Sequence, residues 1–327
     1  MTTRPWLITG GAGYIGSHIA DEFLSSGIDV VVYDSLEGGL ESRVDYLRKK
    51  YKKEIPLIVD DIRNSEFFAR VLKQIEPEGV IHAAALKSVS ESLDKPDLYL
   101  EVNFEATKKI LTLVTQRGIK NFVFASSAAV YGSKDGRNPI RENDQQDPIS
   151  PYGASKLAAE KVVNSFLLVP GNFGTSLRFF NVVGTVASEL MDKSIDNLVP
   201  IVIKKLRSGE TPIIFGTDYL TPDGTCVRDY VDVRDIARAH LKVATSKKPL
   251  PLVMNVGTGR GESVREVIRL IGQSFRLESV DALESNRRPG DPESLFADVT
   301  LISQSIGFEP LYSLKESIES MFLDILP

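Results

Sequence analysis

The sequence predicts an α/β protein with a doubly wound parallel sheet of the Rossmann type and a second, smaller mixed α/β domain. Three observations support this prediction: short apolar segments alternate with longer amphipathic ones, a glycine-rich loop follows the first apolar segment, and the alternation breaks down after residue 180. Continuous apolar strands are typical of a parallel sheet covered on both faces. Strict strand–helix alternation is typical of doubly wound folds.

The elements follow in chain order. The expected strands are residues 6–9, 28–33, 57–59, 79–82, 121–125 and 175–179, and the expected helices are 14–26, 41–53, 65–75, 98–117 and 152–166. Beyond residue 180 the segments shorten, and turn sequences such as Pro-Asp-Gly and Arg-Pro-Gly occur. We therefore expect a large domain of residues 1–180, joined by about residues 229–256, and a smaller domain of residues 181–228 and 257–327.

Composition disfavours several classes of protein. Of the 327 residues 42% are hydrophobic and 25% charged, the net charge is −5, and no basic run indicates a nucleic-acid partner. The single cysteine excludes an intramolecular disulfide, and the three histidines lack a metal-ligand spacing, so no metal is expected. The amino terminus leaves no room for a signal segment, and no apolar run is long enough to span a membrane. We expect a cytoplasmic protein without a membrane partner.

The glycine-rich loop, residues 10–16, reads GGAGYIG between the first expected strand and helix. Glycines at Gly10, Gly13 and Gly16 permit a tight turn and a close approach of backbone N–H groups to a pyrophosphate, which the helix N-terminus also attracts. A glycine-rich loop alone is weak evidence, but its position after a strand and before a helix indicates dinucleotide binding.

Two aspartates follow the next strands. Asp34 ends the second strand, where a carboxylate can accept both ribose hydroxyls of NAD and repel the 2′-phosphate of NADP. Asp34 could instead be a helix cap, and Arg43 is near enough in sequence to leave NADP open. Asp61 ends the third strand and suits either a contact to the adenine amine or an N-cap.

A candidate catalytic pair opens the helix expected at residues 152–166. Tyr152 and Lys156 are four residues apart, so both side chains lie on one side of the helix. A phenol has a pKa of about 10, and a nearby ammonium favours its phenolate, the form that acts as a base. Ser126 and Ser127 end the fifth strand at the ligand-binding edge, where a serine can relay a proton from a substrate hydroxyl to Tyr152 or simply cap the strand.

At this point the sequence resembles a known family. The motifs TGGAGYIGSH, HAAALKSVSES, FASSAAVYG and YGASK match the extended short-chain dehydrogenase/reductase superfamily as far as about Lys156. Within it, LRFFNVVG, DYLTPDGTCVRDYVDVRDIARAH, NVGTG and RRPGD are similar to the UDP-glucose 4-epimerase family nearly to the end of the chain. The resemblance implies an NAD-dependent enzyme of galactose metabolism that interconverts UDP-glucose and UDP-galactose by transient oxidation at carbon 4.

The resemblance also implies roles for individual residues. Tyr152 would be the catalytic base and acid, Lys156 its electrostatic partner and Ser127 the hydroxyl relay. The NAD site would include Gly10, Gly13, Tyr14, Ile15, Gly16, Asp34, Asp61, Ile62, Ala83, Ala84, Ala85, Lys87, Asn103, Tyr152, Lys156 and Phe180. The UDP-sugar would contact Ser127, Tyr152, Asn181, Asn197, Leu198, Phe215, Arg228, Arg288, Asp291 and Leu295. The smaller domain would bind the nucleotide sugar, and we expect a homodimer.

Departures from the family leave the sugar open. Residues 182–194 lack the usual proline- and glycine-rich stretch, Asp196-Asn197 replaces an asparagine pair, and Ala129 and Leu295 differ from many members. Pairs such as UDP-xylose/UDP-arabinose and UDP-GlcNAc/UDP-GalNAc are therefore alternatives. A dehydratase is disfavoured because Ala128 and Ala129, which follow Ser127, cannot transfer a proton. A non-catalytic NAD-binding module is disfavoured because it would not need serine, tyrosine and lysine together.

Overall fold

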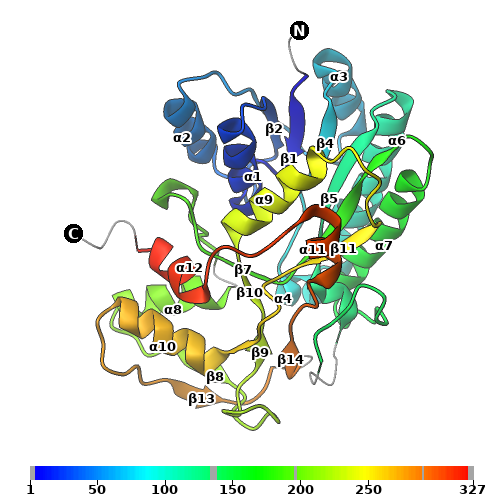
Figure 1. Cartoon of the computed structure of the whole chain (residues 1–327). Coiled ribbons are helices and arrows are strands. Elements are labelled where there is room, and N and C mark those ends of the chain that lie inside the picture. The colour runs from blue at the N-terminus through cyan, green and yellow to red at the C-terminus, as the bar shows by residue number, and fades with distance from the viewer. Residues whose placement is uncertain (1–3, 133–137, 195–196, 289–290, 323–327) are drawn as a thin grey trace.

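The computed structural model describes residues 4–132, 138–194, 197–288 and 291–322, and its largest element is a sheet of seven parallel strands (Figure 1). Their order across the sheet is β3 (Leu57–Val59), β2 (Val30–Asp34), β1 (Trp6–Thr9), β4 (Gly79–His82), β5 (Asn121–Ser127), β6 (Phe173–Phe179) and β11 (Val253–Val256). The order reverses at β1, and ligands of such sheets bind at this switch point, beyond the carboxyl ends of the strands. The predicted doubly wound parallel sheet is confirmed.

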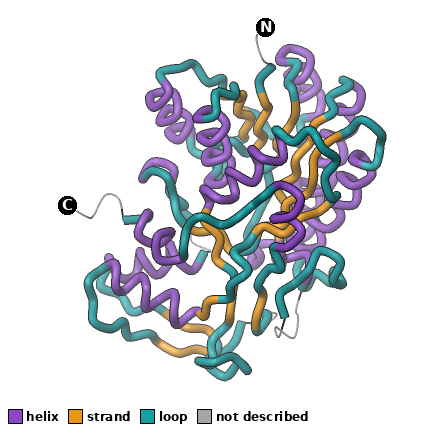
Figure 2. The backbone as a smooth tube through the Cα atoms, in the orientation of Figure 1, coloured by secondary structure: helices purple, strands orange, loops and turns teal. Residues whose placement is uncertain are grey.

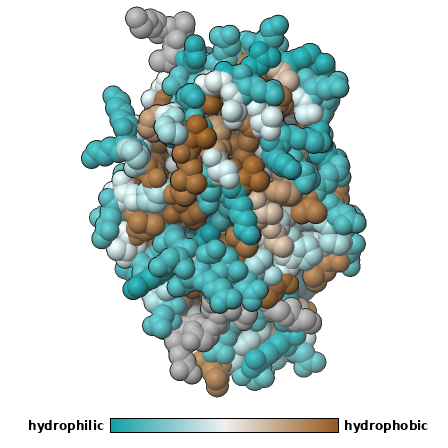
Figure 3. All heavy atoms as spheres, turned by 90° about the vertical axis from the view of Figure 1, so that its right-hand side faces the viewer, coloured by the Kyte–Doolittle hydropathy of each residue, from teal (hydrophilic) through white to brown (hydrophobic). Residues whose placement is uncertain are grey.

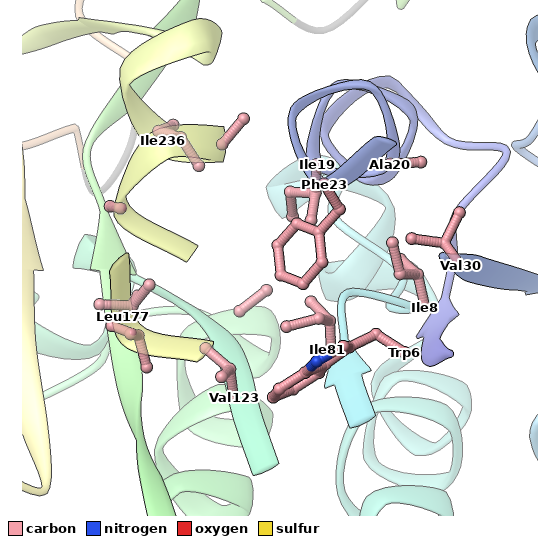
Figure 4. Packing of buried hydrophobic residues seen from close by; sticks show 14 of the residues in the cluster. Trp6, Ile8, Ile19, Ala20, Phe23, Val30, Ile81, Val123, Leu177 and Ile236 are labelled. Atoms are coloured by element: carbon pink, nitrogen blue, oxygen red, sulfur yellow. The ribbon is translucent and has the colours of Figure 1, made fainter. Parts of the chain in front are cut away.

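Helices cover both faces of this sheet, as Figure 2 shows. One face carries α1 (Tyr14–Ser25), α2 (Glu41–Tyr51) and α9 (Val233–Ala244), and the other carries α3 (Ser65–Ile75), α6 (Ala106–Gln116) and α7 (Pro151–Leu167). Successive strand residues point to opposite faces, so Ile8 belongs to the first core and Leu7 to the second. In the first core the rings of Trp6 and Phe23 meet edge to face, with centroids 5.7 Å apart (Figure 4).

The structure shifts several of the expected boundaries by one or two residues and divides one of the expected helices. The second strand begins at Val30 rather than residue 28, because Gly27 (φ +77°) ends α1 and the N–H of Ile28 still donates to Phe23. The helix expected at 98–117 is divided into α5 (Pro96–Leu100), a π-helical turn η1 (Glu101–Glu105) and α6. Single π-helical turns are rare and often occur at functional sites.

The rest of the chain forms small sheets with their own core. The pairs are β7 (Asn181–Val183) with β10 (Tyr230–Asp232), β8 (Ile213–Phe215) with β13 (Leu283–Ser285), and β9 (Val227–Arg228) with both β12 (Glu262–Ser263) and β14 (Ser294–Leu295). The helices and 3-10 turns not yet given are α4 (Val89–Asp94), η2 (Ala128–Tyr131), η3 (Ser188–Leu190), α8 (Leu198–Arg207), α10 (Val264–Ser274), α11 (Thr300–Ile306) and α12 (Leu314–Ser320). None of the helices described here is long and apolar enough to cross a membrane.

The chain crosses between the two parts more than once. After β9 and β10, helix α9 packs against α1, and β11 pairs with β6 at the edge of the large sheet. Both elements fall within residues 229–256, the segment expected to rejoin the large domain. The exact division into two domains stays a prediction.

Three buried histidines lie in the core of the large part. His82, at the end of β4, is hydrogen-bonded to the hydroxyls of Thr9 (2.7 Å) and Thr107 (2.8 Å). Burial, and then the charge of Lys156, lower its pKa to about 3. Burial lowers the pKa of His18 and of His240 to about 4. All three side chains are therefore neutral at pH 7.

These histidines predict a loss of stability in mild acid. Each has a folded-state pKa below the unfolded value, so the unfolded chain binds more protons between about pH 6.5 and pH 4, and stability falls as the pH falls through that window. Each buried histidine should cost about 2 kcal/mol of unfolding free energy at pH 5 relative to pH 7.5.

The test compares urea unfolding of wild type and His82→Gln at pH 7.5, 6 and 5. Glutamine keeps hydrogen-bonding groups for the two threonines and has no proton to gain. His82→Gln should therefore lose less stability between pH 7.5 and pH 5 than wild type. Identical losses would show that His82 is not the neutral buried group described above.

Candidate active site

A cavity of about 680 Å³ opens at the carboxyl ends of β1, β2, β4 and β5. Its volume is in the range of small-molecule and cofactor sites. The expected cofactor residues that line it are Gly10, Gly13, Tyr14, Ile15, Gly16, Asp34, Asp61, Ile62, Ala83, Ala84, Ala85, Lys87, Tyr152 and Lys156. Residues that are far apart in the sequence thus meet at the switch point of the sheet.

The glycine-rich loop leaves the space that a dinucleotide needs. Gly10 has a positive φ of +70°, and a Cβ there would lie 2.6 Å from the backbone nitrogen of Ala84. A Cβ on Gly16 would collide with the carbonyl oxygen of Gly10. Gly13 is the N-cap of α1 and has no side chain to cap the helix, so the N–H groups of the first turn can bind a pyrophosphate. The residues present therefore fit an NAD molecule.

Asp34 lies where the ribose is expected. Its side chain is 6% exposed and accepts hydrogen bonds from the N–H groups of Ala12 and Leu36, both at 2.9 Å. Burial raises its pKa, and these hydrogen bonds oppose the shift. It does not cap α2, because the N-cap of that helix is Leu40. Arg43, which left NADP open, donates to the carbonyls of Ala12 (3.1 Å) and Met191 (2.8 Å).

Asp61 lines the cavity and is paired with Arg63. The Arg63 guanidinium donates to both carboxylate oxygens, at 2.6 to 3.0 Å, and these bonds lower the pKa of Asp61. The N-cap of α3 is Asn64, so the capping alternative for Asp61 is not what the structure shows. The adenine contact stays a prediction.

The candidate catalytic pair lies at the start of α7, where Lys156 is buried and Tyr152 is half-buried. The Lys156 ammonium donates to the carbonyl of Ala125 (2.9 Å) and lies 4.9 Å from the centroid of the Phe124 ring. Burial lowers the pKa of Lys156 to about 7, and Glu160 opposes the shift. Burial raises the pKa of Tyr152, and a hydrogen bond with Ser127 lowers it. Both side chains line the cavity.

The two serines at the end of β5 have different partners. The Ser126 hydroxyl donates to the carboxylate of Glu160, which is itself paired with Arg178 at 2.7 Å, and both partners of that ion pair are buried. Ser127 is hydrogen-bonded to Tyr152, and its Oγ accepts from the N–H of Ala129 (3.2 Å). Ser127 thus caps η2 and is the hydrogen-bond partner of Tyr152, whereas Ser126 is the serine of this pair that lines the cavity.

Two expected cofactor residues are not in the cavity wall. Asn103, in the π-helical turn, is buried, accepts from the Leu86 N–H and donates to the Leu86 carbonyl and the Ser155 hydroxyl. It therefore supports the cavity loop of residues 83–88 from behind. Phe180 packs in a core cluster, and its neighbour Phe179 lines the cavity.

The expected substrate residues fall into groups. Arg228 of β9 forms an ion pair with Asp291, with a nitrogen–oxygen distance of 2.5 Å. Arg228 is also aligned with Leu295 in the parallel pairing of β9 with β14. The Arg288 guanidinium stacks 4.0 Å from the centroid of the Phe215 ring. Leu295 is buried in a cluster with Phe180 and with Ala128, the residue that follows Ser127.

The remaining substrate candidates lie near β7 and α8. Asn181 is exposed on β7. Asn197 is the N-cap of α8, and its side chain donates to Asp192 (2.6 Å), while Leu198 packs against the core of the smaller part. Asp196, the other member of the replaced asparagine pair, lies outside the described residues.

Sequence reasoning missed part of the cavity wall. The cavity is also lined by Asp192, Lys193 and Ser194, which follow residue 180 and were expected in the smaller domain. The sequence marked these residues only by a difference, because they belong to residues 182–194, which lack the proline- and glycine-rich stretch of the family. Among the described residues no cluster of histidine, cysteine, aspartate and glutamate could hold a metal ion.

Comparisons with known proteins agree with this geometry. Residues 6–257 match the model of the NAD dependent epimerase/dehydratase family. UDP-glucose 4-epimerase of Azospirillum brasilense is 37% identical over 95% of this chain and 89% of its own. The crystal structure of UDP-glucose-4-epimerase from Stenotrophomonas maltophila, with bound NAD and formylated UDP-arabinopyranose, has a TM-score of 0.91 at 32% identity, covering 98% of this chain and 97% of that one. The structure from Bifidobacterium longum, in complex with NAD⁺ and UDP, has a TM-score of 0.89 at 33% identity, covering 97% and 96%.

The position of Asp34 predicts selectivity for NAD. A buried carboxylate at the ribose should repel a 2′-phosphate, so the cofactor-free protein should bind NAD at least tenfold more tightly than NADP, about 1.4 kcal/mol in binding free energy. Calorimetric titration with each dinucleotide measures this ratio. Asp34→Asn should reduce it, whereas Asp61→Asn, away from the ribose, should change both affinities alike. Equal or tighter binding of NADP by wild type would refute the role given to Asp34.

Proposed function

The chain belongs to the NAD-dependent epimerase/dehydratase family and is an NAD-dependent nucleotide-sugar 4-epimerase, and we propose that its substrates are UDP-glucose and UDP-galactose. The observation that carries the proposed mechanism is the hydrogen bond between Ser127 and Tyr152. Tyr152 lines the cofactor cavity and lies one helical turn from the buried Lys156 ammonium. This arrangement supports a reaction in which Tyr152 acts as the base, Ser127 as a proton relay and Lys156 as a nearby positive charge.

Three residues act in the proposed reaction. Bound NAD⁺ supplies the acceptor and donor of the hydride at carbon 4 of the sugar. Tyr152, as phenolate, takes the proton of the 4-hydroxyl group directly or through Ser127, and later returns it. Lys156 favours the phenolate by its charge and binds the nicotinamide ribose. The diphosphate is held while the sugar turns to present its other face, so that the hydroxyl is restored in either configuration.

The nucleotide is assigned to the smaller part of the chain. Arg228 and Arg288 offer guanidinium groups to the diphosphate, and Asp291 offers a carboxylate to the uridine ribose. Arg228 and Asp291 are paired, and the Phe215 ring lies against Arg288. These pairings hold the groups in place before the nucleotide binds, which reduces the entropy cost of binding.

Elimination of water is a poorer fit to this site. A dehydratase needs a proton-transferring pair directly after the serine of β5. Here Ala128 is buried in the core and Ala129 donates its N–H to Ser127. Methyl groups cannot move a proton, so the site supports epimerisation.

The finer expectations of a cytoplasmic homodimer in galactose metabolism stay predictions. Figure 3 shows hydrophobic residues gathered on the side of the molecule that carries α6 and α7. Helices α5 and α7 pack together, and the large exposed apolar residues near them include Leu100 and Leu168. A second copy covering such residues would support the dimer.

Replacing Tyr152 with phenylalanine tests the mechanism. Tyr152→Phe removes one oxygen and leaves the ring, so folding and NAD binding should persist while turnover of UDP-galactose falls by roughly a hundredfold or more. Proton NMR of the anomeric region measures this turnover, and can be repeated with each alternative UDP-sugar.

A matched pair of serine variants separates chemistry from packing. Ser127→Ala should lower turnover. Ser126→Ala should mainly lower stability, because the Ser126 hydroxyl donates to Glu160 of the Glu160–Arg178 ion pair.

Turnover of Tyr152→Phe within about tenfold of wild type, a rise of under about 1.4 kcal/mol in the barrier, would mean that another group is the base.

Leu295 is the proposed gate for the carbon-2 substituent. In the resembled family this position borders that substituent, where tyrosine excludes an N-acetyl group and a small residue admits it. Leucine is intermediate in size, so UDP-galactose should be preferred over N-acetylated sugars by an amount of about 1–3 kcal/mol. Leu295→Ser should raise the relative activity on UDP-GlcNAc, and Leu295→Tyr should lower it. If both variants keep the wild-type ratio, Leu295 serves only the core cluster in which it is buried.

A further inference from the structure

Residues 184–194, here called the strap, form a part of the cofactor cavity that the proposed mechanism does not use. The strap leaves β7 at Gly184 and includes η3, and its last residues Asp192, Lys193 and Ser194 line the same cavity as the glycine-rich loop and Asp34. In Figure 1 the green chain after β7 extends toward α2, in agreement with the packing of η3 against α1 and α2. One wall of the cofactor cavity therefore comes from a distant part of the chain.

Arg43 joins the strap to the glycine-rich loop. Its guanidinium donates to the carbonyl of Ala12 in that loop and to the carbonyl of Met191 in the strap. The side chain is 3% exposed, and its Nε has no hydrogen-bond partner among the described residues. Burying a cation is costly unless it is bound, so the two carbonyl bonds are strongly favoured. Arg43 is thus a buried clasp between two walls of the cavity.

Asp192 attaches the strap to the opposite rim. Its carboxylate accepts from the N–H and hydroxyl of Ser194, both at 3.0 Å, and from Asn197 at 2.6 Å. The Lys87 ammonium, on the loop that follows β4, lies 3.7 Å from the same carboxylate. The strap is therefore attached to α2 through Arg43 and to the loop after β4 through Asp192.

The beginning of the strap is held against α1. The Tyr14 hydroxyl donates to the carbonyl of Gly184 (2.6 Å), and the N–H of Val186 donates to the ring of His18 (3.2 Å). The strap is thus attached to α1, α2 and the loop after β4, and the attaching residues Tyr14, Arg43 and Lys87 all line the cavity.

We propose that the strap retains the bound dinucleotide between the two half-reactions, and that Arg43 is the positioning residue that keeps the strap closed. The inference rests on the proposed function, in which a hydride taken from the sugar must be returned to the same sugar. Loss of the cofactor between these steps would leave the ketone form of the sugar stranded. A strap bound on both rims of the cavity slows that loss without touching the reacting atoms.

The test measures release of NAD from the purified holoprotein in the absence of any sugar. Arg43→Met keeps an unbranched apolar stem and removes the charge and both hydrogen bonds, and should release NAD at least tenfold faster than wild type. Arg43→Lys keeps the charge and can retain one bond, and should give an intermediate rate. Turnover of Arg43→Met should also come to depend on added NAD.

Arg48→Met is the matched control. Arg48 lies on the same helix and donates to the carbonyl of Ile55 (3.0 Å), away from the cavity, so its loss should leave NAD release unchanged. Asp192→Asn tests the other attachment and should also speed release, which keeps the inference testable if Arg43→Met does not fold.

Release at the wild-type rate from every Arg43 and Asp192 variant that folds would overturn the strap and leave the proposed function standing. A wild type that holds NAD but does not turn over UDP-galactose would overturn the proposed substrate and leave the strap standing.

Discussion

The parallel register of β1, β4 and β5 is the constraint on which the site depends. Thr9 is aligned with His82, and His82 with Phe124, so the loops that follow these three strands leave the sheet at one edge. The glycine-rich loop, the loop of residues 83–88 and the serines at the end of β5 meet there because these parallel strands run in the same direction, with β5 continuing beyond Phe124 to Ser127. The close approach of the first two loops then requires glycine, since any Cβ on Gly10 would overlap the backbone of Ala84. If one of these strands slipped by one residue, every side chain on it would move to the opposite face of the sheet.

The buried charges behind the cavity follow from the same arrangement. Tyr152, Lys156 and Glu160 are spaced four residues apart on α7, so one face of this helix carries the proposed base, a cation and a carboxylate. Glu160 is held by Arg178 of β6 and by Ser126 of β5, which ties the helix to two strands. Removing one partner of such a pair would leave an uncompensated charge in the core, so the pair helps to define where α7 lies. The position of Lys156 beneath the cavity thus depends on residues that touch neither cofactor nor sugar.

The sequence predicted what local pattern and motif determine. Apolar periodicity located the strands of the large sheet, and spacing placed Tyr152 and Lys156 on one side of a helix. It did not predict where side chains point when distant packing decides. Asn103 lies in a π-helical turn, and its side chain is hydrogen-bonded to Leu86 and Ser155 rather than exposed in the cavity wall. Phe180 packs in a cluster that includes Leu295 of β14, a strand more than a hundred residues later in the chain. The sequence likewise contained no indication of the strap, because its proposed role depends on contacts with Arg43, more than a hundred residues earlier in the chain.

The proposed mechanism requires that carbon 4 is oxidised and then reduced within one cavity. UDP-galactose carrying deuterium at carbon 4, incubated with the enzyme in ordinary water and analysed by NMR, tests it most directly. The mechanism predicts UDP-glucose that retains the deuterium at carbon 4, because the hydride removed by the cofactor returns to the same carbon. UDP-glucose with protium at carbon 4 would contradict the mechanism, because the hydrogen would then have exchanged with water.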